Sequence, residues 1–288
     1  MSVAPIRIVG GGQHAGVVPA LGHGLVVEFH AATGEVWELL GDNDRGLEAF
    51  LAPAALDSLQ GVVEWDRVES VGRFGVRKTG PRNFRVPGFD FTLRVTLRAF
   101  ERGGLPHVAR RWFDAWSFAE PGRLVIRSDF GARWLWVESP GLPSWPDALS
   151  GRRAWEMDMG VSVPEGHLWG DVTTFVGGHV QVRAGGDAPL NPWCQVWWDG
   201  RATSVTLPHG QVVALPGVGS PRIINLDRGM SGQVTREDGT VDTAVWSSLR
   251  GMVQAVTLSP GGVSSWHLGD GVELRVTPRF LSPWGVRS

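Results

Sequence analysis

Apolar side chains recur at every second position along several stretches of this 288-residue chain. From Phe91 to Ala99 the odd positions are apolar, whereas the even positions hold Thr and Arg. The stretch from Trp155 to Val163 has the same alternation. A helix would need apolar spacings of three and four, so this pattern predicts antiparallel strands with one buried face and one face in water. We therefore expect a β-rich fold, between all-β and α+β.

Shorter segments of the same kind are separated by Gly, Pro, Asp and Ser, which favour turns. They predict strands at 25–30, 35–40, 123–128, 132–138, 172–183, 194–199, 211–215, 222–227, 232–236, 254–259 and 271–277. Two further segments, 32–35 and 128–131, have the composition of hairpin turns. Most of the chain is thus expected to form short strands joined by tight turns.

Helical spacing occurs clearly in one segment, where apolar residues fall on one helix face: Leu105, Val108, Ala109, Trp112 and Trp116. Pro106 suits a first helical turn, and the Pro-Gly pair at 121–122 closes the segment. A second, shorter helix over 46–59 is a further prediction. One packed helix among many strands fits the β-rich interpretation.

Residues 184–192 are small, turn-forming and almost free of apolar bulk, so they predict a domain boundary. We expect an N-terminal domain at 1–185 and a C-terminal domain at 186–288. The short strands and turns of the second domain favour a small β-sandwich or jelly-roll.

Composition excludes several classes of protein. Apolar residues make up 42% of the chain, which is enough for a core, and the net charge of −2 predicts no electrostatic attachment to nucleic acid or anionic membrane. The N-terminus lacks the apolar segment of a signal peptide, and no run of 18 apolar residues predicts a membrane span, so we expect a chain made without export. Cys194 is the single cysteine, and its apolar context predicts a buried, inert thiol.

No motif predicts a cofactor or a metal. Residues 10–15 match G-x-G-x-x-A, but Gly16 and Pro19 leave no room for the helix that a dinucleotide site needs. Eight histidines are scattered along the sequence without the close spacing of metal ligands: His14, His23, His30, His107, His167, His179, His209 and His267. Glu156 and Asp158 share a strand face, but it is the polar one, which favours solvated charges over an acid–base pair.

Tryptophan is the remaining signal, with 15 Trp and no Tyr in the chain. Trp packs cores, anchors protein interfaces and stacks on sugar rings. We favour a core or subunit-interface role over a ligand platform. The candidates for glycan or interface contacts are Trp193, Trp197, Trp198 and Trp266.

The order of these segments resembles that of the distal tail proteins of long-tailed phages, the minor tail proteins of actinobacteriophage type. In the first half the resemblance lies in the segment Gly34–Leu39, the helix at 106–118, the hairpin at 124–136 and the strand at 155–163. In the second half it lies in Gly186–Pro189, 205–207, 211–215, Ile223–Asp227, the turn at 228–232, the hairpin at 237–239, 258–261, Val272–Arg279 and the closing Pro283–Trp284. These segments span most of the chain.

The resemblance implies an N-terminal tail-tube-like antiparallel β-sandwich or barrel with one packed helix, and a C-terminal galectin-like or jelly-roll β-sandwich. It implies a virion structural protein, made in the host cytoplasm, whose ring, usually hexameric, joins the tail tube protein to the tail-tip hub protein. DNA would pass through the lumen without specific binding. No active site or cofactor is implied.

Two other interpretations remain open. The C-terminal Trp residues are also consistent with a carbohydrate-binding β-sandwich module that contacts the host surface. A hydrolase with an unrecognised carboxylate site has no motif in its favour and would need a cleft that joins acids scattered along the sequence.

Overall fold

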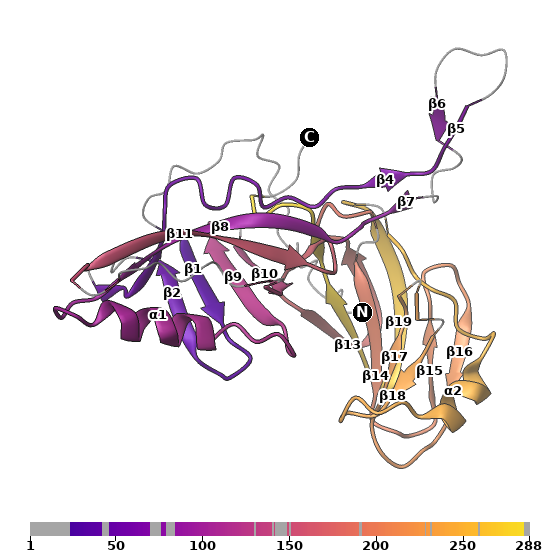
Figure 1. Cartoon of the computed structure of the whole chain (residues 1–288). Coiled ribbons are helices and arrows are strands. Elements are labelled where there is room, and N and C mark those ends of the chain that lie inside the picture. Colours follow the sequence, from indigo (N-terminus) through magenta and orange to yellow (C-terminus); the bar gives the residue numbers. More distant parts are fainter. Residues whose placement is uncertain are drawn as a thin grey trace. The chain divides into compact units, whose positions relative to one another are not determined.

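A computed structural model describes the following residues of the chain: 24–41, 46–69, 76–78, 84–129, 131–139, 141, 149, 151–189, 192–227, 229–230, 232–258 and 260–284. Within them the chain forms two compact units (Figure 1). The N-terminal unit contains residues 24–168 and 280–284, and the C-terminal unit contains residues 169–279. The glycine-rich segment at 10–15 lies outside the described residues.

The two units divide at 168/169, earlier in the chain than the segment at 184–192. The difference concerns β13 (Thr173–Arg183), which pairs along its length with β19 (Val263–Thr277) and so belongs to the C-terminal unit. Residues 184–192 instead connect strands within that unit. A local scarcity of apolar residues marks a surface loop as well as a domain boundary, and long-range strand pairing distinguishes the two.

The first sheet of the N-terminal unit has six strands in the order β2-β1-β9-β10-β12-β20. Their bounds are β1 (Val26–His30), β2 (Val36–Leu40), β9 (Gly122–Ser128), β10 (Gly131–Val137), β12 (Leu168–Trp169) and β20 (Arg279–Phe280). Two predicted hairpins, β1–β2 and β9–β10, are confirmed. The turn between β1 and β2 requires Gly34, whose φ of 89° lies in the left-handed region. The chain crosses between the units within β12 and again within β20.

The second sheet has three strands in the order β11-β8-β3, with β3 at Ala49–Leu51, β8 at Phe89–Arg98 and β11 at Ala154–Val163. β8 and β11 are the two strands with the clearest alternation in the sequence, and they pair over ten residues from Ala154 opposite Arg98 to Val163 opposite Phe89. Burial alternates along both strands as predicted. A backbone bridge between Glu138 and Ser162 joins this sheet to the first one.

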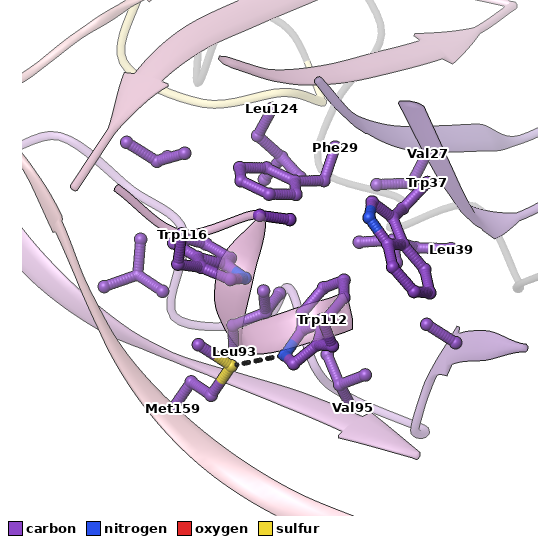
Figure 2. Packing of buried hydrophobic residues seen from close by; sticks show 14 of the residues in the cluster. Val27, Phe29, Trp37, Leu39, Leu93, Val95, Trp112, Trp116, Leu124 and Met159 are labelled. Atoms are coloured by element: carbon purple, nitrogen blue, oxygen red, sulfur yellow. Dashed lines mark hydrogen bonds between the residues drawn. The ribbon is translucent and has the colours of Figure 1, made fainter. Parts of the chain in front are cut away.

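Helix α1 (Leu105–Asp114) is confirmed, and it buries the apolar face that its spacing predicted. Trp112 of the helix and Trp116, just after its C-terminal end, lie in the core, where Trp116 stacks on Phe29 with ring centroids 4.1 Å apart (Figure 2). Trp112 meets Trp37 edge-on at 5.3 Å, and its Nε1 donates to Sδ of Met159 at 3.0 Å. The helix therefore links both sheets through an aromatic cluster.

The helix predicted at 46–59 is wrong. The segment begins with the short strand β3 and continues in turns, where backbone bonds such as Leu59 N to Leu56 O close only one turn each. Pro53 precedes Ala54, whose φ of 64° is incompatible with a right-handed helix. Leu56 and Leu59 are nevertheless buried, so the apolar spacing reflects core packing of a turn-rich loop.

Four short strands follow in the N-terminal unit, and the sequence did not predict them. β4 (Glu64–Trp65) pairs with β7 (Phe84–Arg85), and β5 (Arg67–Glu69) pairs with β6 (Val76–Lys78). The two pairs follow one another along a two-stranded ribbon (Figure 1). Trp65 and Phe84 contact each other across it, with ring centroids 5.1 Å apart.

The C-terminal unit is built on one seven-stranded antiparallel sheet that includes β13 and β19. Its other strands are β14 (Trp193–Trp198), β15 (Thr203–Thr206), β16 (Val212–Leu215), β17 (Arg222–Asn225) and β18 (Val234–Thr235). The first part of β19 pairs with β15, and its last part pairs with β14. The sheet thus has two halves that enclose a single apolar cluster, as in the predicted β-sandwich.

β13 and β19 run through both halves and bend between them. The register of β13 slips between Val176 and Gly178, and β19 bends opposite, at Gly269–Gly271. Gly271 adopts a φ of 70°, and a Cβ there would lie 2.6 Å from Oδ2 of Asp199. Strands turn sandwich corners through such irregularities. The glycines at this bend interrupt the strand pattern in the sequence. The prediction therefore contained only the last part of β19, as a strand at 271–277.

Two segments after β18 differ from the prediction. Helix α2 (Thr243–Leu249) was missed, although Asp242 is its N-cap and accepts a hydrogen bond from N of Val245 at 3.2 Å. The strand predicted at 254–259 does not form over 254–258, the part of it that the structure describes. Its buried residue Val256 instead donates its backbone N–H to O of Leu226 as part of a loop.

Candidate functional site

The exposed side of β8 and β11 forms a polar surface that we call the β8–β11 polar face. It consists of Asp90, Thr92, Arg94, Thr96, Arg98, Glu156, Asp158, Gly160 and Ser162. It carries three acidic side chains, Asp90, Glu156 and Asp158, and two basic ones, Arg94 and Arg98, so the charges largely cancel. It lies opposite the aromatic core, and it is the water-facing side that the period-2 pattern predicted.

An ion pair lies at the centre of this face. Arg94 is directly opposite Asp158 in the register, and its Nε and Nη2 donate to the two carboxylate oxygens at 2.7 and 3.2 Å. Glu156 lies 3.9 Å from the same Nε. The hydrogen bond from Arg94 lowers the pKa of Asp158, and the hydrogen bond to Asp158 raises the pKa of Arg94. Both side chains are therefore charged at neutral pH.

The edge of β11 is a second feature of this region. Among the described strands, β11 pairs along its length with β8, while on its other side Ser162 makes the bridge to Glu138. The strand edge from Ala154 to Val161 therefore presents backbone groups that a further strand can pair with. Exposed strand edges of this length are sites of association between chains.

The outer side of the first sheet carries two aromatic residues that the sequence did not single out as site candidates. Trp134 and Trp136 of β10 meet edge-on at 5.5 Å, and Trp136 is 36% exposed. The guanidinium of Arg123 lies 5.6 Å from the centre of the Trp134 ring. Their alternation with the buried Leu135 and Val137 was the signal that could have placed them on the outer face.

An acid–base network lies on the same side of this sheet. Glu28 contacts Nε2 of His30 and Nη1 of Arg127, each at 2.8 Å. Burial, the largest single influence, would raise the pKa of Glu28, but the hydrogen bonds from Arg127 and His30 outweigh it, and the pKa is lowered. The network thus holds an ionised carboxylate between an arginine and a histidine.

Arg111 ties helix α1 to the rest of the N-terminal unit. Its guanidinium contacts Glu35 and Glu48, each at 2.7 Å, and lies 4.9 Å from the centre of the Trp37 ring. The hydrogen bond to Glu35 is the main reason that the pKa of Arg111 is raised. These contacts stabilise the position of the helix.

The structure separates the four Trp candidates into two pairs. Trp198 and Trp266 are fully buried in the C-terminal core, with exposed fractions of 0% and 1%. Their Nε1 atoms donate to O of Pro216 at 3.3 Å and to Oγ of Ser264 at 2.9 Å. The expectation of an interface or glycan contact is therefore corrected for these two residues, because their rings lie on the inward side of their strands.

Trp193 and Trp197 keep partial exposure. Nε1 of Trp193 donates to Oδ1 of Asn225 at 2.7 Å, and its ring contacts Trp169 at 5.2 Å. Nε1 of Trp197 donates to Oε1 of Glu237 at 3.2 Å, while Arg275 lies over its ring at 5.6 Å. Both indoles are thus already engaged by neighbours of the same unit.

Cys194 is buried, as predicted, and burial raises the pKa of its thiol to about 12. The thiol is therefore protonated and unreactive at neutral pH. Among the residues that the structure describes, no three His, Cys, Asp or Glu side chains come together as a metal site. Within the same residues, no helix is long and apolar enough to span a membrane.

The fold of this chain is similar to that of a phage tail protein of known structure. The Dit protein of phage SPP1, "a Paradigm of Hub Adsorption Apparatus in Gram-positive Infecting Phages", aligns with a TM-score of 0.59 at 10% identity. The alignment covers 89% of this chain and 99% of the SPP1 protein. At this identity the similarity establishes the fold, and the fold is the one that the resemblance to distal tail proteins implied.

Chains of the phage P2 baseplate in its activated conformation align less well. The structure with Ca gives a TM-score of 0.46 at 6% identity, and the structure with Sr gives 0.45 at 8% identity. Each alignment covers 88% of this chain and 97% of the baseplate chain. No protein-family model matches the sequence, and no curated protein matches it.

Proposed function

We propose that this protein is a structural component of the tail tip of a long-tailed phage, of the distal tail type. The observation that carries the proposal is the fold, because the similarity to the SPP1 Dit protein extends over nearly all of that protein and over residues of both units here. The ordered segments of the sequence support the same class of protein. In this role the chain is part of the virion.

The proposed assembly is a ring, with six copies as the expected number, that joins the tail tube protein to the tail-tip hub protein. The edge of β11 supports ring formation, since its backbone groups from Ala154 to Val161 can pair with a strand of a neighbouring copy. Continuation of one sheet from copy to copy closes a barrel and removes the exposed edge.

The β8–β11 polar face is proposed to line the lumen of this ring. Its charged side chains remain in water there, and the pairing of Arg94 with Asp158 leaves little net charge to hold passing DNA. The proposed role involves no catalysis.

The ring is tested by electron microscopy and sedimentation velocity of the purified protein, together with mass spectrometry of intact phage particles. We expect closed rings and a tail-tip location. A protein that remains monomeric at all concentrations and is absent from particles would contradict the proposal.

The lumen assignment is tested by thiol labelling, for which the inert Cys194 provides a clean background. The variant Asp158→Cys places a thiol on the polar face, and Glu120→Cys places a control thiol on an exposed turn of the same unit. In rings, a small maleimide should label both positions, whereas a bulky polyethylene glycol maleimide should label the control alone. Equal labelling of both by the bulky reagent would exclude a lumenal polar face.

Carbohydrate binding by the C-terminal unit has less support. The burial of Trp198 and Trp266 removes two of the four rings proposed for it. Glycan-array screening tests the remaining two, Trp193 and Trp197. Binding that is lost in Trp197→Ala would restore this alternative.

A further inference from the structure

Two histidines that are 88 positions apart in the sequence lie side by side on the C-terminal unit. His179 of β13 is directly opposite His267 of β19 in the antiparallel register, and their ring centroids are 4.5 Å apart. Both side chains are exposed. Among the described residues, the aromatic ring that each of these imidazoles contacts is that of the other histidine.

The surroundings of the pair are polar and open. Gln181 and Ser265 form the next pair along the same face, and Thr206 of β15 lies opposite His267 on its other side. Arg183, the next charged residue along this face of β13, is two rows away. The two imidazole side chains are therefore accessible from solvent, and neutral side chains that carry oxygen atoms occupy the neighbouring positions.

We propose that His179 and His267 together bind a divalent transition-metal ion such as Zn²⁺, Ni²⁺ or Cu²⁺. Neutral imidazole is a preferred ligand of these ions. With metal–nitrogen bonds of about 2 Å, the ion would lie about 3.2 Å from each ring centroid, so the observed separation corresponds to an angle of about 90° between the two bonds. This angle suits two adjacent ligands of one ion, and water completes the coordination.

The position of the pair gives the metal a structural effect. Among the described strands, β13 pairs with β19, and the two histidines lie just beyond the bend at Gly177–Gly178. An ion held by one residue of each strand joins the two strands directly. Because binding requires the folded register, the metal should raise the thermal stability of the C-terminal unit.

The test uses the full-length protein, free of any tag, with ZnCl₂ and NiCl₂ as probes. Isothermal titration calorimetry at pH 7.5 should show one saturable site per chain. His179→Gln and His267→Gln should each lower the affinity at least about tenfold, because a single imidazole loses the advantage of the second ligand already in place. The control is His107→Gln, which removes an exposed histidine of α1 and should leave the affinity unchanged.

Two further readouts distinguish this site from an effect of the substitutions on folding. Zn²⁺ should raise the Tm of the wild-type protein and of His107→Gln, but not of the double variant His179→Gln/His267→Gln. MgCl₂ should have no effect, since Mg²⁺ prefers oxygen ligands. Equal Zn²⁺ affinity in the wild-type protein and the double variant would overturn the proposal, as would a Tm shift that persists in the double variant.

Discussion

The two units of this protein bury tryptophan in different ways. In the N-terminal unit Trp112 contacts Trp37, Trp116 and Phe29, and Trp116 also stacks on Phe29. Among the described residues, Nε1 of Trp37 and of Trp116 has no hydrogen-bond partner. In the C-terminal unit Trp198 and Trp266 lie on separate strands, and each Nε1 has an acceptor.

The comparison shows two solutions to the same packing problem. A helix between two sheets provides room for a cluster of rings, and aromatic contacts and burial stabilise it even where indole N–H groups remain unbonded. A sandwich enclosed by strands holds fewer rings, and backbone carbonyls and strand hydroxyls lie within reach of each one. Substitutions in the two units test this difference.

Trp112→Ala should destabilise the N-terminal unit by about 3–5 kcal/mol, because it removes a fully buried ring that contacts Trp37, Trp116 and Phe29. Denaturant unfolding and calorimetry both measure this loss of stability. If the two units unfold in separate transitions, Trp112→Ala should shift the transition of the N-terminal unit and leave unchanged the transition of the C-terminal unit, which is the one that Trp266→Ala shifts. A loss below about 1 kcal/mol would show that the aromatic cluster is not the centre of this core.

Asp242→Asn should lower the Tm of the C-terminal unit by several degrees. Asp242 caps α2 and forms a buried ion pair with Arg222 at 2.8 Å, so its loss leaves a buried guanidinium without a counter-charge.

The pH dependence of stability checks the same ion pair. The hydrogen bonds from Val245 and Arg222 lower the pKa of Asp242 from its ordinary value of 3.8. Its stabilising effect is therefore complete above the unfolded pKa and is lost as the pH falls below about 4 through the lower folded pKa. Wild-type stability should decline in this range more steeply than that of Asp242→Asn, and parallel curves would contradict the assignment.

Replacing one indole in each unit separates packing from hydrogen bonding. Trp266→Phe removes ring volume and the bond to Ser264, whereas Trp37→Phe removes ring volume but no observed hydrogen bond. We expect the first variant to be less stable than the second by about 1 kcal/mol in denaturant unfolding. Equal losses would mean that the N–H partner in the sandwich contributes little.

The smallest effect is expected for Asp158→Asn on the β8–β11 polar face. Its ion pair with Arg94 is about half exposed, and water and salt screen such pairs. The Tm should change slightly at low salt and not at all in 1 M NaCl. A drop in Tm as large as that of Asp242→Asn would mean that the exposed ion pair of the N-terminal unit stabilises the fold as much as the buried ion pair of the C-terminal unit does.

Local patterns predicted much of the fold. The alternation in Phe91–Ala99 and Trp155–Val163 identified β8 and β11, because a strand places successive side chains on opposite faces whatever its partners are. The spacing of Leu105, Val108 and Trp112 identified α1 for the corresponding reason. The loop at 46–59 shows the limit of this reasoning, since Leu56 and Leu59 have helical spacing but pack from successive turns.

The candidate surfaces were less predictable. Trp266 and Trp197 were both candidates because the C-terminal half is rich in Trp. Trp266 is nevertheless buried and Trp197 is partly exposed, because the direction of each side chain depends on the register of its strand. The sequence by itself determined a β-rich chain with one amphipathic helix, an inert cysteine and a near-neutral charge. The tertiary structure decided which residues meet. It placed His179 beside His267, a contact that no local spacing encodes, because strands pair residues far apart in the chain.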